Sequence, residues 1–569
     1  MHDHELYDCA ANRIKLGKRP TPGQEKIAFP TMSKAQQDTL NEDFATVCYE
    51  EGLPFSLFKS PAMKQVLRQL NPSYKPPSRI KIAGPLLDKV YSKTKDKVEE
   101  YLDSLSELNI ITDESSNINK ARIANISIHT PLGSIYWLSE DLGSMQSTSV
   151  NIAEWLERHL HTLTHGNLER INSCANDTCP AMLAMWEHLR LKPGLQHLFL
   201  IPCDSHGIQL LVQDLVLSIP QFKKVHDDAQ TVAKAFKNAH LQYARLHEIQ
   251  HQEYGRTWAI VLAVATRWGS EKGLLDGLFR SKAAIQRYAI RFKDMPKDVL
   301  DIILSSEFWS NLEALRIILK PLDDALRMSE SNHSTLAHIL SRWNTIMEHL
   351  EEMRTLYPSE EFEWFMTKEH DERLKPKGTF LKRYDVLFVT DARFERQVHD
   401  IHIAAFYLDP VNRTVELDDY NNQRIFKFFQ KCARSEEEAN LMHTHFSLWR
   451  EQLTPFENGA FCWRFAGTGA REFWISTINR TKALGTLCNR LFSTPANSVP
   501  SERSFSAQNY IHTKTRNSLK PDRVDKLIYI YMNSRVFDAR KEGNQLLTAE
   551  EEEQSEEEMD ELEDVEFEE

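Results

Sequence analysis

The sequence predicts a mixed α/β fold that is interrupted by a large all-helical insertion and ends in a disordered acidic tail. Strand-like segments rich in β-branched residues concentrate between positions 105 and 203, interleaved with amphipathic helical segments. From about 220 to 480 the apolar residues recur at helical spacing with few strand signals. Residues 550–569 contain 14 acidic and no basic residues, a composition typical of disordered chain.

The N-terminal part reads as a linker followed by helices. Residues 13–35 mix Lys, Arg, Pro and Gly without periodicity, which predicts a basic linker. Helical spacing follows on both sides of the Pro-rich break at 71–79, so we expect a small N-terminal helical region.

Residues 105–203 predict one sheet layer with helices. A tight turn at 131–133 joins two adjacent strands. Hairpin strands followed by helix, strand, helix and strand form a mixed α/β layer rather than a helical bundle. The predicted strands are 105–113, 121–130, 133–139, 168–177 and 195–203, and the predicted helices are 147–163 and 179–191.

The helical block separates this layer from one further informative segment. Its clearest helical patterns are 222–255 and 340–357, and the segment 496–537 is expected to begin in a loop and end in an apolar helix. The predicted domains are 1–35, 36–104, 105–219, 220–480, 481–540 and 541–569.

Composition narrows the class of protein. A length of 569 residues allows several domains. The net charge of −13 comes from the acidic tail, and the rest of the chain is near neutral; the tail either solubilises the chain or binds a basic partner. Eight irregularly spaced Cys predict reduced thiols in an intracellular protein. The longest apolar runs, such as 258–265, are far below the roughly 20 residues of a membrane span, and no secretory signal is evident.

Two acidic residues stand near the ends of separate predicted strands. Asp113 and Asp177 would lie together at one edge of the sheet, where ligands and catalytic groups of such sheets usually bind. Carboxylates brought together in this way hold Mg²⁺ or Mn²⁺. The alternative interpretation is that each Asp caps a turn or a helix.

Cys203 and His206 follow the last predicted strand with Cys-x-x-His spacing. The pair is a zinc half-site, a catalytic pair or a packed corner. Two ligands without a second pair make a poor structural zinc site.

Five segments in order resemble the hAT family of transposases and their domesticated relatives. The most specific is the Ser-Glu-Arg-x-Phe-Ser block at 501–506, followed by TRNSLKPDRVDKL at 515–527, which resembles the C-terminal dimerisation region of that family. The resemblance runs from about residue 50 to 537. The five segments are 111–130, 171–189, 199–215, 265–270 and 497–506.

The resemblance implies an RNase H-like core that is interrupted by a helical insertion and carries an Asp-Asp-Glu triad. By motif, Asp113, Asp177 and Glu502 are the catalytic residues and the ligands of Mg²⁺ or Mn²⁺. Glu502 lies 325 positions after Asp177, so the fold must return it to the sheet. Where relatives have Thr before the second Asp, this chain has Asn176, which still hydrogen-bonds locally.

The resemblance also implies DNA contacts. Cys203 and His206 match a motif that handles DNA beside the active site. Arg267 and Trp268 match the insertion-domain segment of that family, in which the Trp stacks on a flipped base. Stacking on a base is a role that an aromatic ring can fill. The alternative interpretation is that Trp268 is a core residue.

At the N-terminus, His4 and Cys9 resemble the last ligands of a BED-type zinc finger. The Cys-x-x-Cys that would complete such a site is not present in the sequence, so zinc is not expected in this chain. Arg13, Lys15, Lys18 and Arg19 could contact phosphates without reading sequence.

The resemblance therefore predicts a nuclear hAT-like DNA transposase that acts as a homodimer or higher homo-oligomer, without a membrane anchor. One alternative is a domesticated, catalytically silent protein that retains DNA binding and dimerisation. Another is a general nuclease of ribonuclease H type that cleaves without regard to element ends.

Overall fold

The computed structural model describes residues 32–116, 120–146, 148–263, 268–331, 333–356, 386–512 and 519–541. The finger remnant at His4 and Cys9, Arg267 and the acidic run 550–569 lie outside the described residues. The chain forms two compact units, residues 1–93 and 94–569. Within the described residues, no helix is both long enough and apolar enough to cross a membrane.

The first unit is helical. Ser33 begins α2 with a capping box to Gln36, which satisfies two backbone groups at the helix start. The Tyr49 hydroxyl donates to the carbonyl of Ile82 at 2.6 Å and ties α2 to the chain before α5. The helical elements here are α2 (Lys34–Glu50), η2 (Leu57–Lys59), α3 (Pro61–Leu70), α4 (Arg79–Lys81), η3 (Ile82–Leu86) and the beginning of α5 (Leu87–Asp103).

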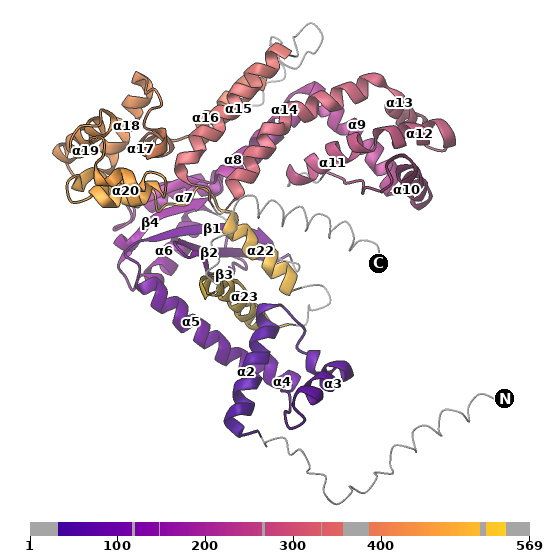
Figure 1. Ribbon diagram of the computed structural model, residues 1–569, viewed down its shortest axis with the longest axis horizontal. Helices are drawn as coiled ribbons and strands as arrows, with labels where there is room; N and C mark the ends of the chain where they lie inside the picture. Colours follow the sequence, from indigo (N-terminus) through magenta and orange to yellow (C-terminus); the bar gives the residue numbers. More distant parts are fainter. Residues whose placement is uncertain are drawn as a thin grey trace, which may run out of the picture. The chain divides into compact units, whose positions relative to one another are not determined.

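The second unit is built on a mixed five-stranded sheet in the order β3-β2-β1-β4-β5 (Figure 1). β1 pairs antiparallel with β2 and parallel with β4, and β5 is parallel to β4. This order and these directions are those of an RNase H-like sheet, so the predicted fold class is confirmed. The strands are β1 (Leu108–Ser116), β2 (Arg122–Thr130), β3 (Gly133–Asp141), β4 (Ile171–Asn176) and β5 (Phe199–Pro202).

The strand predictions were right in number, order and approximate position, with one consequence for the site. β1 continues to Ser116, so Asp113 lies within the strand and not at its end. The polar residues after Asp113 stay in the strand because each pairs with a residue of β2, down to Ser116 with Arg122.

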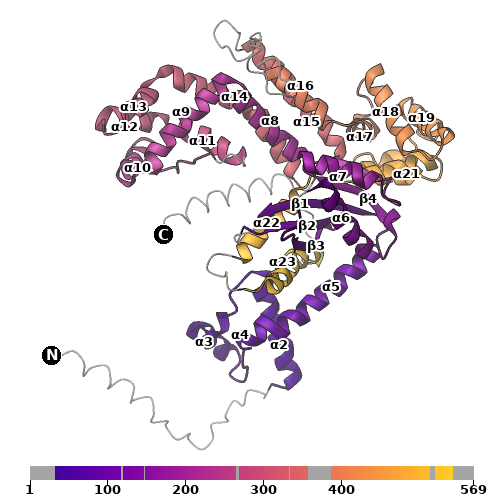
Figure 2. The ribbon, with the colours of Figure 1, turned by 180° about the vertical axis from the view of Figure 1, so that it is seen from behind.

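Helices pack on this sheet. α6 (Ser149–Leu163) and α7 (Pro180–Arg190) match the predicted helices and contact each other. α22 (Val499–Ile511) packs on β1 and β2, and α23 (Pro521–Lys541) packs on the edge strand β3 (Figure 2). The buried Asn533 amide exchanges two hydrogen bonds with the backbone of Tyr136, which covers polar groups at that edge.

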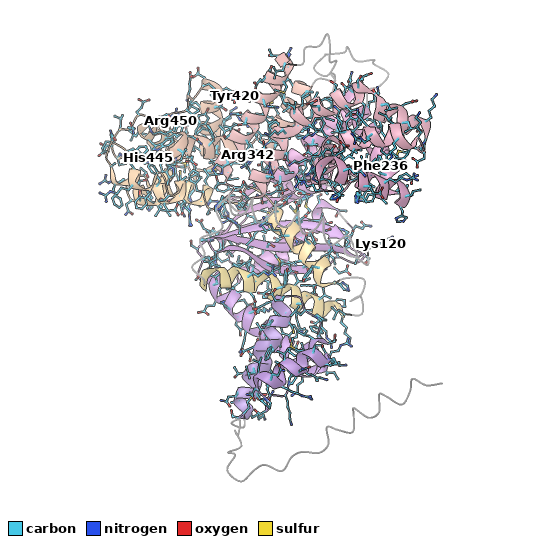
Figure 3. All side chains as sticks on the ribbon, turned by 45° about the vertical axis from the view of Figure 1, so that its right-hand side comes forward. Lys120, Phe236, Arg342, Tyr420, His445 and Arg450 are labelled. Atoms are coloured by element: carbon cyan, nitrogen blue, oxygen red, sulfur yellow. The ribbon has the colours of Figure 1, made fainter. Side chains whose placement is uncertain are left out.

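The helical insertion follows β5 directly and shares its core with the sheet. The apolar cluster extends from Ile111 and Ile201 through α8 to Phe236 and Trp309, so the insertion and the sheet form one continuous core. Phe236, in the insertion, is labelled in Figure 3. The insertion helices are α8 (Asp204–Ser218), α9 (Pro220–Lys237), α10 (His240–Tyr254), α11 (Trp268–Arg280), α12 (Lys282–Phe292), α13 (Lys297–Leu304), α14 (Ser306–Glu330), α15 (Leu336–Leu356), α16 (Val386–Gln397), α17 (Asp400–Leu408), α18 (Asp419–Cys432), α19 (Glu436–Arg450) and α20 (Ala470–Thr477).

The structure refines one predicted pattern and differs from another prediction. The helical pattern at 222–255 forms two helices, α9 and α10, because the backbone is extended at Ala239, directly after Asn238 ends α9. The loop expected from residue 496 is short, since α22 begins at Val499 with Pro500 in its first turn, a position that proline favours. Glu502 therefore lies in a helix.

Candidate active site

Three carboxylates reach the same part of the fold from three separate elements. Asp113 lies in β1, and Asp177 directly follows β4. The two strands are parallel neighbours with Ile111 opposite Ala175, so both residues come at the carboxyl-terminal side of that pairing. Glu502 lies in the first turn of α22, which packs on β1 and β2.

Asn125 connects the first and third of these elements. It is opposite Asp113 in the β1–β2 register, so both side chains point to the same face. Its amide oxygen accepts from the Asp113 amide at 3.2 Å, and its amide nitrogen donates to the Ser501 carbonyl at 3.0 Å and to the Ser504 hydroxyl at 2.6 Å. Through these hydrogen bonds, the fully buried Asn125 holds the turn that carries Glu502 against the strand that carries Asp113.

The electrostatics show that these carboxylates influence one another. Burial and, to a smaller extent, the negative charges of Asp177 and Glu502 together raise the pKa of Asp113 to about 8, against a hydrogen bond from the Glu114 amide that lowers it. Burial also raises the pKa of Asp177, while His206 and Ser498 oppose that rise. Strongly shifted carboxyl groups that repel each other are typical of functional sites.

Cys203 and His206 both lie near Asp177, but Cys203 is a buried thiol that binds the backbone, whereas His206 contacts the Asp177 carboxylate. The Cys203 thiol is fully buried, and its sulfur accepts the Ser498 amide at 3.2 Å. Burial raises the pKa of Cys203 above its usual value, so the thiol stays neutral. His206, in the first turn of α8, places Nδ1 3.4 Å from Asp177 Oδ2. The Ser498 hydroxyl lies 3.4 Å from Asp177 Oδ1.

Asn176, the residue that departs from the family pattern, anchors the backbone beside Asp177. Its amide nitrogen donates to the Asp177 carbonyl at 2.7 Å, and its amide oxygen accepts from the Trp186 indole at 2.7 Å. Asn176 is fully buried, so this link fixes the end of β4 against α7.

A buried ion pair joins the start of α8, which follows the site residue Cys203, to α15. Asp204, the first residue of α8, accepts from Arg342 Nε at 2.9 Å and Nη2 at 2.6 Å, and from Trp343 Nε1 at 3.0 Å. Asp204 is fully buried and Arg342 is 6% exposed. Arg342 lies near the start of α15, where the helical block meets the sheet (Figure 3).

The donor set partly fits a divalent cation. Carboxylate oxygens are the ligands that Mg²⁺ and Mn²⁺ prefer, and a cation would offset the repulsion that raises the Asp113 pKa. In the part of the chain that the structure describes, however, no three His, Cys, Asp or Glu side chains are gathered closely enough to hold a metal ion. Holding one here would require at least one of the three carboxylates to move.

The other predicted DNA contacts are placed only in part. Trp268 begins α11, but its side chain and the whole of Arg267 lie outside what the structure describes. Sequence reasoning missed Asn125, Ser498, Asp204 and Arg342. Only Asn125 had a local signal, a strand-disfavoured polar residue in the middle of the apolar pattern of β2.

The sheet order, the returning helix α22 and the three converging carboxylates define the class as an RNase H-like core with a candidate Asp-Asp-Glu site. Two family models match the chain. Residues 461–534 match the hAT family C-terminal dimerisation region, and residues 77–232 match a domain of unknown function, DUF659. The protein is therefore related to the hAT transposases and carries their dimerisation region, which indicates a homodimer. No curated protein sequence matches the chain.

The two matched regions divide the candidate site between them. Asp113, Asp177, Cys203 and His206 fall within 77–232, and Glu502 falls within 461–534. The insertion segment with Arg267 and Trp268 lies outside both matches, as does the N-terminal His4.

Proposed function

We propose that this protein is a hAT-like DNA transposase that cleaves and rejoins DNA strands at Asp113, Asp177 and Glu502. The observation that carries the proposal is the convergence of these residues from β1, the end of β4 and the first turn of α22, with a raised Asp113 pKa as its electrostatic consequence. DNA is the substrate, and the nucleus is the compartment where the protein would meet it.

The three acidic residues would hold Mg²⁺ or Mn²⁺, which activates a water or sugar hydroxyl and stabilises the leaving oxygen of a phosphodiester. Asn125 orients the Glu502 turn toward Asp113 through its hydrogen bonds to Ser501 and Ser504. His206, whose Nδ1 lies 3.4 Å from Asp177 Oδ2, limits the freedom of that carboxylate. The buried Cys203 supports the backbone of Ser498.

The proposal is tested by strand cleavage. Purified full-length protein is incubated with supercoiled plasmid and Mg²⁺ or Mn²⁺, beside Asp177→Asn and a matched control, Asp227→Asn. Asp227 is an exposed aspartate of α9 that pairs with Lys223, outside the site. We expect nicking by the wild type and by Asp227→Asn, and a loss of at least 100-fold in Asp177→Asn, because one carboxylate of such a site is worth several kcal/mol.

Nicking that persists unchanged in Asp177→Asn would show that the activity does not come from this site. A folded, dimeric protein that cleaves nothing would instead support a second candidate, a catalytically silent DNA-binding and dimerisation protein of the same descent. The match at 461–534 favours that candidate, because it describes a dimerisation region and not an activity.

A further inference from the structure

The first unit contains a basic segment that has no acidic residue. Between Glu51 and Asp88 the chain carries six basic residues, and all six side chains are exposed. Among the residues that the structure describes, none of the six forms an ion pair with a carboxylate, whereas Glu42 of α2 pairs with Lys89 and Lys93. The charges of this basic segment are therefore available to an anionic ligand. The six residues are Lys59, Lys64, Arg68, Lys75, Arg79 and Lys81.

The backbone that carries these charges is held in place. Lys64 and Arg68 are four positions apart in α3, so they lie on the same face of that helix. The Gln37 side chain of α2 accepts from the Lys75 amide at 3.2 Å and donates to the Lys75 carbonyl at 2.6 Å. Because the backbone is already ordered, a ligand would bind with a smaller loss of entropy.

Apolar side chains are exposed among the basic ones. Val66 is 50% exposed and Leu70 71%, both in α3, and Ile80, between Arg79 and Lys81, is 82% exposed. Exposed apolar residues that are gathered in one place mark contacts with another molecule or segment. The basic segment therefore suits a ligand that carries negative charges and apolar groups together.

One segment of this chain has that composition. The acidic tail, residues 550–569, contains 14 acidic and no basic residues. Its last eleven residues also include Met559, Leu562, Val565 and Phe567, each separated from the next by acidic residues. The charges and the apolar groups of the tail thus both complement those of the basic segment.

The tail is long enough to reach the basic segment. It follows α23, which ends at Lys541, and near that end Phe537 lies 5.9 Å from Tyr101 between ring centroids. Tyr101 belongs to α5, the helix that begins in the first unit at Leu87. The 28 residues after Lys541 can span at most about 95 Å, at roughly 3.4 Å per residue. The attachment point therefore does not prevent the tail from reaching the first unit.

We propose that the acidic tail binds to the basic segment of the first unit, with its carboxylates beside the basic side chains and its apolar residues against Val66, Leu70 and Ile80. Because the tail belongs to the same chain, its effective concentration at this surface is on the order of millimolar, so even weak binding keeps the surface occupied. The bound tail withholds the surface from other polyanions. This inference does not rest on the proposed function, and it requires neither a metal ion nor cleavage.

A phosphodiester backbone fits this surface less well than the tail does. It would satisfy the basic residues, but it would leave Val66, Leu70 and Ile80 without apolar partners. Duplex DNA therefore serves as the competing ligand in the test.

The test is fluorescence anisotropy of a labelled peptide with the sequence of residues 550–569, titrated with two forms of the protein. We expect the peptide to bind a variant that ends at Lys541, and to bind the full chain at least tenfold more weakly, because the tethered tail competes. A peptide with Leu562→Ser and Phe567→Ser keeps all 14 acidic residues. It should bind the shortened variant about tenfold more weakly than the native peptide does, because two apolar contacts are lost.

Substitutions in the protein locate the site. Lys64→Gln/Arg68→Gln in the shortened variant should weaken peptide binding about fivefold, because two exposed charge pairs are removed. Lys234→Gln/Lys237→Gln is the matched control, since it removes two charges from exposed side chains of one helix, α9, and should leave peptide binding unchanged. Equal melting temperatures of the two double variants would show that both are folded.

Three results would overturn the proposal. Equal peptide affinity of the full chain and the shortened variant would show that the tail does not occupy the site. An equal loss of affinity in both double variants would show that only the overall charge matters. Duplex DNA that binds the shortened variant and is lost in Lys64→Gln/Arg68→Gln, while the peptide does not bind, would assign the surface to nucleic acid.

Discussion

The Asp204–Arg342 pair gives the sharpest test of how the insertion holds the candidate site in place. The Asp204 carboxylate is fully buried and accepts three hydrogen bonds, two from Arg342 and one from Trp343. Arg342→Met keeps the apolar stem of the side chain and removes the charge. Asp204 would then be a buried anion with only the indole as partner.

Breaking a buried pair in this way costs about 3–5 kcal/mol, because one charge is left without compensation. Unfolding entropy is about 2.1 cal/mol/K per residue, so a unit the size of residues 94–569 changes its melting temperature by about 1 °C for each kcal/mol. We therefore expect Arg342→Met and Asp204→Leu each to melt about 3–5 °C below the wild type.

The double variant Asp204→Leu/Arg342→Met separates a charge effect from a packing effect. With both charges gone, the remaining cost is one unpartnered indole N–H, about 1–3 kcal/mol. The double variant should therefore melt above both single variants. Lys223→Met is the control, because Lys223 and Asp227 form an exposed pair worth less than about 1 kcal/mol.

The measurement is the thermal unfolding of the purified proteins at one concentration and ionic strength, followed by tryptophan fluorescence. A double variant that melts below both single variants would refute the reasoning, since it would show that the two residues act independently. A melting temperature of Arg342→Met equal to that of the wild type would refute it as well.

Three further predictions concern the same unit. Asp113→Asn should raise the metal-free melting temperature by about 2–4 °C at pH 7.5, because it removes a carboxylate whose pKa is raised to about 8, and should abolish the stabilisation by Mg²⁺ that the proposed function predicts for the wild type. Burial lowers the pKa of His129 to about 4, so its contribution to stability is lost as the pH falls from 6.5 to 4; His129→Gln should reduce the acid-induced drop in melting temperature by up to about 3 °C. In Gly207→Ala the new Cβ would meet the buried Gln397 side chain, at 2.4 Å in the present structure, so thermal melting should show a loss of about 1–3 kcal/mol that Gln397→Ala partly restores.

The sheet was predictable because its strands carry a local signal. β2 alternates apolar and polar residues from Ala124 to His129, and a tight turn at Gly133, where φ is +115°, joins it to the apolar run 135–138 of β3. The end of β1 was not predictable in this way. Glu114, Ser115 and Ser116 look like a loop in the sequence, and only their pairing with β2 keeps them in the strand.

The acidic residues were found by motif, but their surroundings were not. Asp204 and Arg342 are 138 positions apart, and nothing near either residue in the sequence indicates a buried pair. The loop expected at 496 was replaced by the start of α22, because contacts with the sheet stabilise a helix whose own sequence has weak amphipathic character. Such contacts exist only in the folded chain.

The position of Glu502 is fixed by hydrogen bonds to the sheet as well as to the insertion. The chain before α22 is bonded directly to the strands: Asn109 donates to the Ser493 carbonyl at 2.8 Å, and Asn172 donates to the Arg490 carbonyl at 2.9 Å. The chain after that point is held by Asn125 at the Ser501 carbonyl. Hydrogen bonds to β1, β2 and β4 therefore fix the segment on both sides of its entry into α22, and the end of α14 in the insertion adds two more, which its carbonyls accept from Asn497 and Arg503.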